Sequence, residues 1–431
     1  MKKFITLSLL TFTLITNLNA NEVQNEEEEP TRFESLSKLT KVLGTVEKYY
    51  VDEIQLNEIV NKALKGLMQE LDAHSSFLDK KSSKEMSIQT KGEFGGLGIT
   101  VGMRDKALTV ISPIDGTPAY DAGIESSDII LKIDDKATLN MTLDEAVSLM
   151  RGKPGTDIVL TVVREGESKP LPIKITRDII KIQSVFAKKI ENEDLLYLRV
   201  SSFDSKVVSG MTDAINQADY AKGIILDLRN NPGGLLSQAI GAVDIFVDEG
   251  VIVSQKGRDV NDEEKFDATV TGTLTKLPVV VLVNGGSASA SEIVSGALQD
   301  HKRAVVVGEK TFGKGSVQAV LPISDDRSEN IKLTIAKYYL PSGRTIQATG
   351  VTPDIIAHDG EVAKADDNAF QIKEADLKKH LEGELEKIGD KPEANEEKAD
   401  DKTIVTVEKI EEDNQLNTGI NILKSLIIMS K

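Results

Sequence analysis

The chain has 431 residues, of which 40% are hydrophobic and 28% charged, a composition that is ordinary for a globular protein. Its formal net charge of −17 argues against nucleic acid as a partner, because phosphate binding needs a basic surface. The lack of cysteine excludes disulfides, thiol nucleophiles and thiolate metal sites. A chain of this length is expected to fold as roughly two to four domains.

The first twenty residues have the three-part pattern of a cleaved export signal. Two lysines follow Met1, an apolar run extends from Phe4 to Ile15, and the stretch ends at the small residue Ala20. The run is shorter than the roughly 20 apolar residues that a membrane-spanning helix needs. We therefore expect residues 1–20 to be a signal peptide and the protein to be exported to the periplasm or cell envelope.

Two segments with different patterns follow. Residues 21–91 start with an acidic stretch and continue with apolar residues at helical spacing, so they predict an N-terminal helical region. Residues 92–176 contain a predicted helix that begins with a capping box, formed by Thr142 and Glu145. They also contain four apolar runs bounded by turn residues, which predict strands at Leu97–Val101, Ala107–Ile111, Ile129–Ile133 and Ile158–Val163.

The rest of the chain alternates between strand and helix patterns. Residues 177–360 include two strands of the buried type, Ile224–Leu228 and Val279–Val283, each followed by a Gly-rich turn and a helical segment. This alternation indicates α/β layers. Residues 361–431 are expected to be an acidic extension followed by a C-terminal helix.

Residues 308–314 match most of a nucleotide-binding P-loop, G-x-x-x-x-G-K. Gly315 stands where the P-loop needs Ser or Thr, and a β-branched run follows where it needs a helix. Lys314 is therefore expected on a turn between two strands. Burial there would lower its pKa, so that its amine could act as a base, and Gln318 could orient that amine without charging it.

The stretch NGGSASASE (residues 284–292) runs from a buried strand through a Gly-rich turn into a helix. Such a turn can present a hydroxyl where backbone amides face a developing anion. Ser289 and Glu292 also fit a simple capping box, so a structural role stays open. The turn DLRNNPGG (residues 227–234) joins strand to helix in the same way, and its glycines allow an amide to point at a ligand.

Together, four stretches resemble the carboxyl-terminal processing proteases, which are exported serine peptidases with a Ser–Lys dyad and an inserted PDZ domain. The stretches are GGLGITV (95–101), DLRNNPGG (227–234), NGGSASASEI (284–293) and GEKTFGKGSVQ (308–318). The resemblance implies a multi-domain α/β fold. It would comprise a PDZ domain at 92–176, a Ser–Lys peptidase core at 177–360 and helical N- and C-terminal segments.

The family pattern also implies roles for single residues. Ser289 would be the nucleophile, Lys314 the base and Gln318 its support. The oxyanion would be held by backbone amides, namely those of Ala290 and of either Gly233 or Gly234. Glu292 is the acid of the family's motif, and its role could be purely structural. No metal or cofactor is implied.

In the PDZ segment, the resemblance implies a loop that holds a peptide's C-terminal carboxylate while the peptide adds to the sheet as an extra strand. The loop would be Gly96, Leu97, Gly98 and Ile99. The side-chain pocket would be lined by Leu143, Val147 and Met150. The alternative is that the glycines only permit a tight turn and that the helix face belongs to the core. Arg151 is a candidate contact between this domain and the active site.

The predicted function is an exported endopeptidase that cuts proteins near their C-termini. Its partners would be unstructured C-terminal tails of envelope proteins, and its terminal helical segments are candidates for homo-oligomer contacts. One alternative is a non-catalytic PDZ-bearing adaptor or chaperone. Another is an α/β hydrolase of small esters that uses His301 as its base. The pair Asn230–Asn231 and the acidic segment 361–412 do not map onto the family pattern.

Overall fold

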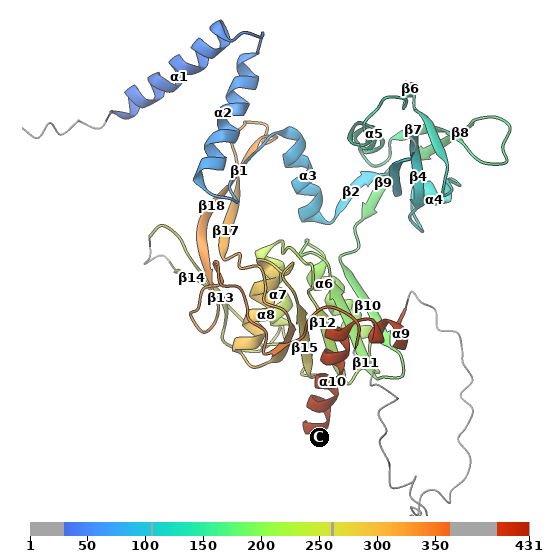
Figure 1. Cartoon of the computed structure of the whole chain (residues 1–431), viewed down its shortest axis with the longest axis vertical. Coiled ribbons are helices and arrows are strands. Elements are labelled where there is room, and N and C mark those ends of the chain that lie inside the picture. The colour runs from blue at the N-terminus through green and yellow to red at the C-terminus, as the bar shows by residue number, and fades with distance from the viewer. Residues whose placement is uncertain (1–29, 105–106, 260–262, 363–402, 431) are drawn as a thin grey trace, which may run out of the picture. The chain divides into compact units, whose positions relative to one another are not determined.

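The computed structural model describes residues 30–104, 107–259, 263–362 and 403–430 (Figure 1). The expected signal peptide and most of the expected acidic extension lie outside these ranges. Within the described part of the chain, no helix has both the length and the apolar character that crossing a membrane requires. The chain divides into two units, Met1–Leu67 and Met68–Lys431.

The described part of the first unit is helical, as its sequence pattern predicts. α1 (Arg32–Tyr49) begins at a capping box, in which the Thr31 and Glu34 side chains each accept a hydrogen bond from the other residue's N–H. α2 (Leu56–Leu71) also begins in this unit. α1 buries none of its residues, and Phe33 is 80% exposed. The apolar side chains of α1 therefore do not contribute to a core.

The second unit opens with short elements that lead into a separate sheet. They are β1 (Ser76–Leu78), α3 (Lys80–Lys91) and β2 (Glu93–Gly96). β2 pairs antiparallel with β9 (Asp178–Lys181), so the chain enters and leaves the segment between them along neighbouring strands. Gly92 ends α3 in the left-handed region, which glycine adopts without steric cost.

The segment between β2 and β9 forms a six-stranded sheet around its own core. Its strands are β3 (Ile99–Arg104), β4 (Ala107–Pro113), β5 (Ile129–Ile133), β6 (Lys136–Ala137), β7 (Asp157–Val163) and β8 (Leu171–Thr176). Its helices are α4 (Pro118–Asp121) and α5 (Leu143–Met150). The order is β3-β4-β5-β7-β8, with β6 paired to β5, so β3 lies at one edge. The four expected strands are confirmed, although the first begins later than expected, at Ile99.

A seven-stranded sheet forms the centre of the remaining chain. Its order is β19-β16-β15-β12-β11-β10-β20, and β11, β12, β15 and β16 run parallel. Figure 1 labels β10, β11, β12 and β15 of this sheet. The strands are β10 (Val185–Ile190), β11 (Leu195–Val200), β12 (Gly223–Asp227), β15 (Val279–Val283), β16 (Ala304–Gly308), β19 (Ile355–Ile356) and β20 (Ile404–Val405). The helices are α6 (Val207–Gln217), α7 (Leu236–Asp244), α8 (Ala290–Asp300), α9 (Val407–Glu411) and α10 (Asn414–Met429).

The central strands of this sheet are covered on both faces. Along β12, Ile224 and Leu226 belong to the same core cluster as side chains of α7 and α8. Ile225, between them, belongs to a second cluster with side chains of α10. Because both faces are covered, these strands have continuously apolar sequences rather than an alternating pattern.

Three sequence motifs follow the carboxyl ends of neighbouring parallel strands. β12 ends at Asp227, β15 at Val283 and β16 at Gly308, and the three strands are adjacent in the sheet. The carboxyl ends of parallel strands meet at one edge, which is where open α/β sheets bind ligands. The topology therefore brings DLRNNPGG, NGGSASASE and GEKTFGKG together.

A five-stranded sheet completes the second unit. It has the order β1-β18-β13-β14, and β17 also pairs with β18. Its further strands are β13 (Val251–Lys256), β14 (Glu263–Asp267), β17 (Ser316–Pro322) and β18 (Asn330–Tyr339). Lys314 lies between β16 and β17, which confirms the expected turn between two strands.

The C-terminal helix is tied to the turn after β12 by a largely buried network. Arg229 donates to Asp227 at 2.7 Å, and its Nη1 donates to Asp413 at 2.8 Å and to Gln415 at 3.2 Å. Asp413 also caps α10, because it accepts a hydrogen bond from the Leu416 N–H at 2.9 Å. The network therefore joins the last helix to the segment that leads into the glycine pair.

Replacing Asp413 by Ala removes one partner of Arg229, whose side chain is 11% exposed, and uncaps α10. We expect the free energy of unfolding to fall by about 2–3 kcal/mol, as for hydrogen bonds to charged groups. Urea denaturation followed by circular dichroism measures the change. Lys424→Ala is the matched control on the same helix, since its ion pair with Glu193 is solvent-exposed and should contribute little. Equal losses in both variants would contradict a stabilising role of the network.

Candidate active site

Of the three serines in the stretch SASAS, only Ser289 faces open space. Ser287 and Ser291 are fully buried, and their hydroxyls donate to the carbonyl oxygens of Leu228 at 2.8 Å and Asn231 at 2.9 Å. Ser289 is half-buried and lines a cleft of about 1150 Å³. It precedes α8 with φ 54° and ψ −110°, a strained backbone conformation for a residue with a side chain.

The buried carboxylate of Glu292 joins the turn of Ser289 to the turn of Lys314. Its Oε2 accepts hydrogen bonds from the N–H groups of Ser289 and Lys314, both at 2.8 Å. Its Oε1 accepts from the Gly313 N–H at 2.7 Å and from the Thr311 hydroxyl at 2.6 Å. Glu292 is fully buried, so these four donors replace the water that its charge would otherwise bind.

Lys314 lines the same cleft as Ser289. Burial of its amine lowers the pKa of Lys314, and the positive charge of Lys332 lowers it further, while Asp72 and Glu292 act in the opposite direction. Its amine therefore loses a proton more readily than that of an ordinary lysine.

The glycine pair of the first turn lies against Ser289. A Cβ added at Gly233 would lie 2.9 Å from the Ser289 Cβ and 3.0 Å from the Ala290 nitrogen, so only glycine fits there. The Gly233 N–H donates to Asn231 Oδ1 at 2.9 Å and is therefore occupied in this structure. Within the described ranges, the N–H groups of Gly234 and Ala290 have no hydrogen-bond partner. Of the three amides that were expected to hold the oxyanion, these two are therefore the unoccupied ones in the described residues.

Asn231 holds the glycine turn against the serine turn, a role that the sequence analysis missed. Its side chain is fully buried, accepts from Gly233 and donates to the Val200 carbonyl at 2.8 Å. Its own carbonyl accepts from the Ala288 N–H at 3.0 Å and from the Ser291 hydroxyl. An Asn in a Gly-rich turn after a buried strand was the available signal, but it fits a plain turn equally well.

The structure contradicts His301 as a base for Ser289. His301 lies at the opposite end of α8, roughly 18 Å away at 1.5 Å per residue. Its Nε2 hydrogen-bonds the carbonyl of Val251 at 2.8 Å. His74 is closer to the site than His301, because the charge of Lys314 reaches it. Burial and then this charge lower the pKa of His74. His74 does not line the cleft.

Gln318 also lines the cleft, from β17. Its Nε2 donates to the hydroxyls of Ser316 at 2.9 Å and Thr334 at 3.2 Å. Ser289, Lys314, Gln318 and the glycine pair therefore meet in one cleft, although they come from three turns and a strand.

The residues expected to bind a peptide surround the edge strand β3. Within the described ranges, the N–H groups of Leu97 and Gly98 have no hydrogen-bond partner, and they lie between Gly96 at the end of β2 and Ile99 at the start of β3. The α5 side chains divide between core and surface. Leu143 and Val147 are half-buried, whereas Met150 is 6% exposed and Leu97 is 2% exposed, so both of these belong to the core.

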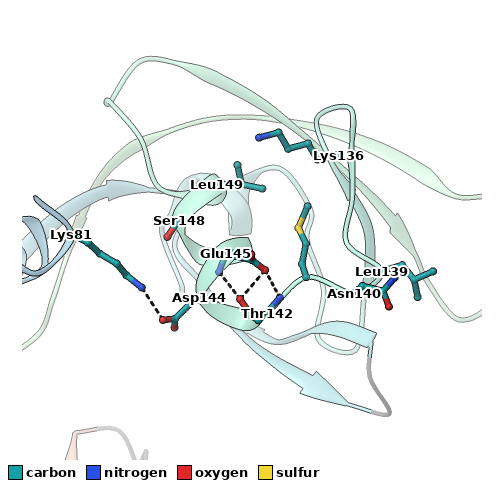
Figure 2. Close-up of a pocket in the computed structure, with 10 residues that line it drawn as sticks. Lys81, Lys136, Leu139, Asn140, Thr142, Asp144, Glu145, Ser148 and Leu149 are labelled. Carbon is teal, nitrogen blue, oxygen red and sulfur yellow. Dashed lines mark hydrogen bonds and ion pairs between the residues drawn. The ribbon is translucent and has the colours of Figure 1, made fainter. Parts of the chain in front are cut away.

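Two further features of this domain are the position of Arg151 and a hollow beside α5. The Arg151 guanidinium stacks 4.9 Å from the Phe94 ring centre on β2, and Arg151 does not line the cleft. A hollow of about 740 Å³ lies beside the first turn of α5 (Figure 2). There Asp144 pairs with Lys81 at 3.0 Å. The expected capping box of Thr142 and Glu145 is confirmed beside it.

Replacing Glu292 by Gln tests whether this carboxylate positions Ser289. Each carboxylate oxygen of Glu292 accepts from two donors, and the substitution replaces one of these oxygens by an NH₂ group. This NH₂ group would face two other donors, so the serine turn or the lysine turn must move. We expect the rate of labelling of Ser289 by a fluorophosphonate to fall at least about tenfold. Ser295→Ala, one turn further along α8, is the control and should label normally. Unchanged labelling of a folded Glu292→Gln protein would show that the carboxylate does not position the serine.

Comparison with known proteins agrees with these features. Residues 194–357 match Peptidase family S41, and residues 95–175 match the PDZ domain family.

The chain is 43% identical over 389 residues to the carboxy-terminal-processing protease of Bartonella bacilliformis, an alignment that covers 89% of this chain and 87% of that relative. It is 36% identical to carboxy-terminal processing protease CtpA of Bacillus subtilis, over 76% of this chain and 70% of the relative. A solved photosystem II D1 C-terminal processing protease matches at 27% identity with a TM-score of 0.42, covering 74% of this chain and 91% of that one. The chain therefore belongs to the carboxy-terminal-processing proteases, serine-type peptidases of family S41 that carry a PDZ domain.

Proposed function

We propose that the protein is an endopeptidase in which Ser289 is the nucleophile and the free amine of Lys314 is the general base. The observation that carries this proposal is that one carboxylate oxygen, Glu292 Oε2, binds the backbone N–H groups of both residues. A nucleophilic serine needs a base within reach, and the lowered pKa of Lys314 suits that task. Family membership favours this function over a non-catalytic adaptor.

In the proposed reaction, Ser289 Oγ attacks the peptide carbonyl carbon while Lys314 Nζ takes the hydroxyl proton. The N–H groups of Ala290 and Gly234 stabilise the tetrahedral anion. When the anion collapses, the C–N bond breaks and the Lys314 ammonium returns the proton to the leaving amine. Water then attacks the acyl-enzyme with Lys314 again as base, which releases a carboxylate and regenerates Ser289.

Because the reactive form of Lys314 is the neutral amine, kcat/KM should rise with pH through the pKa of this group. That pKa lies below the ordinary lysine value, since burial disfavours the charged form. Lys314→Arg should lose at least about a hundredfold in kcat/KM, the usual contribution of a general base, because guanidinium does not give up its proton. Hydrolysis of an unstructured protein between pH 5 and 10 provides the measurement.

The control for this experiment is Lys310→Arg, which changes an exposed lysine on the same turn. It should keep the wild-type rate and pH profile. Activity retained in Lys314→Arg, or a profile without an acidic limb, would rule out Lys314 as the base.

We place the recognition of substrate ends in the PDZ domain. The free N–H groups of Leu97 and Gly98 support this, since such amides can hold a terminal carboxylate, and the edge strand β3 can pair with an extended peptide. The half-buried Leu143 and Val147 would then contact an apolar terminal side chain. The name carboxy-terminal-processing protease, which the relatives bear, fits cleavage near C-termini.

Amidating the C-terminus of an unstructured peptide that ends in Ala, Val or Leu should lower its cleavage rate about tenfold or more. The loss corresponds to one charge-assisted hydrogen bond of roughly 1.5–3 kcal/mol. Rates of the free-acid and amidated peptides are compared at sub-saturating concentration. Val147→Asp should reduce the ratio between the cleavage rates of the free-acid and amidated peptides. Ser148→Asp places an equal charge on the neighbouring exposed position and should leave this ratio unchanged. Equal rates for the two peptides would mean that the carboxylate is not read.

Export and assembly complete the proposal. Export to the periplasm or cell envelope is supported by the sequence pattern of residues 1–20, which lie outside the described residues. The proposed substrates are then unstructured tails of envelope proteins. Homo-oligomer formation through the terminal helices is supported by the exposed apolar side chains of α1.

A further inference from the structure

A chain of hydrogen bonds runs from Gln318, on the cleft, to Asp72, in the loop between α2 and β1. Gln318 Nε2 donates to the Thr334 hydroxyl at 3.2 Å, and this hydroxyl donates to Asp72 Oδ1 at 3.1 Å. β1 and β17 both pair with β18, which contains Thr334, and this pairing brings the loop next to Gln318. All three residues belong to the second unit.

The donor-to-acceptor direction of these hydrogen bonds is fixed at Asp72. An ionised carboxylate only accepts hydrogen bonds, and a threonine hydroxyl has a single hydrogen. Because Thr334 gives that hydrogen to Asp72, it can only accept from Gln318. The Gln318 side chain must therefore turn its nitrogen toward Thr334, where Nε2 also donates to Ser316. Its amide oxygen is left for the cleft, which Lys314 also lines.

Asp72 is itself held firmly in the ionised state. Its carboxylate accepts hydrogen bonds from the Ser75 hydroxyl at 2.7 Å and from the N–H groups of His74 at 2.7 Å and Ser75 at 2.9 Å. These bonds, first that of the Ser75 hydroxyl, lower the pKa of Asp72 to about 2. The Ser75 hydroxyl accepts in turn from the Thr334 N–H at 3.1 Å, which fixes the loop against β18.

We propose that Asp72 is a positioning residue for the general base: through Thr334 it holds the Gln318 amide with its oxygen toward Lys314. The proposal rests on Lys314 being the base. A neutral amine has two hydrogens and one lone pair. The Gln318 amide oxygen accepts one hydrogen of the Lys314 amine. The lone pair of that amine then stays free for the Ser289 proton. A flipped amide would instead point its NH₂ group at the lone pair and compete with the serine.

Thr334→Val removes the chain of hydrogen bonds but keeps the charge of Asp72. We expect kcat to fall about tenfold, the order of one lost hydrogen bond, with KM and the acidic limb of the pH profile unchanged. Thr334→Ser keeps the hydroxyl and should restore kcat to within about twofold. Active-site titration of Ser289 gives kcat per competent site, so that a loss of folded protein is not counted.

Asp72→Asn adds a second, separable effect. The charges that face Lys314 are those of Lys332, Asp72 and Glu292, with His74 nearby, and Asp72 raises the pKa of Lys314. The Asn side chain still offers an amide oxygen to the Thr334 hydroxyl and lacks only the charge. We therefore expect kcat to fall less than in Thr334→Val, and the acidic limb to move to lower pH. Asp326→Asn is the matched control, because this carboxylate accepts similar hydrogen bonds from Ser324 and Ser328 in the turn between β17 and β18, away from the cleft.

Wild-type kcat in Thr334→Val, or failure of Thr334→Ser to restore it, overturns the proposal, and the Thr334 pair decides even if Asp72→Asn does not fold. The result is distinct from a failure of the proposed function. An inactive Lys314→Arg enzyme together with a fully active Thr334→Val enzyme would remove only the role of Asp72. An active Lys314→Arg enzyme would remove the base itself.

Discussion

The candidate active site depends on one buried carboxylate. Glu292 carries a charge that has no access to water, and a buried charge is tolerated only when hydrogen-bond donors surround it. Three of its four donors are backbone N–H groups, one from the serine turn and two from the lysine turn. Moving either turn would leave part of the charge unsatisfied. The same carboxylate that stabilises this part of the fold therefore fixes Ser289 and Lys314 relative to each other.

Glu292 also affects the pKa of the lysine whose turn it holds. Its charge raises the pKa of Lys314, whereas burial and Lys332 lower it, with burial the largest effect. The negative charge is thus placed at the backbone of the lysine turn, where it holds the geometry, and the amine remains easier to deprotonate than an exposed lysine. Geometry and reactivity are compatible because the carboxylate is already occupied by four other donors.

Much of the fold could be predicted from local patterns. Continuous apolar runs such as Val279–Val283 indicated buried parallel strands, and the parallel topology explains why the turns after β12, β15 and β16 meet. The missing hydroxyl after Lys314 and the β-branched run that follows it correctly excluded a P-loop. The turn residues and the capping box of residues 92–176 indicated a small sheet with one longer helix, which the structure contains.

The contacts that join distant segments could not be predicted in the same way. Asp72 and Asp413 each sit in an ordinary capping or turn sequence, and nothing nearby shows that they contact Thr334 and Arg229. Similarly, Leu143 and Met150 lie on one apolar face of a helix, but only packing shows that Met150 enters the core while Leu143 stays half-exposed. A periodic pattern identifies an apolar face, whereas the division of that face depends on its neighbours.

The most direct test of the account is a crystal structure of the protein with a peptide boronate, which mimics the tetrahedral anion. We expect a covalent bond from boron to Ser289 Oγ, a boronate oxygen within hydrogen-bond distance of the Ala290 and Gly234 nitrogens, and Lys314 Nζ beside Ser289 Oγ. Glu292 should keep its hydrogen bonds to both turns. A boronate bound elsewhere, or bound to Ser289 with Lys314 turned away, would contradict the assignment of these residues as one catalytic unit.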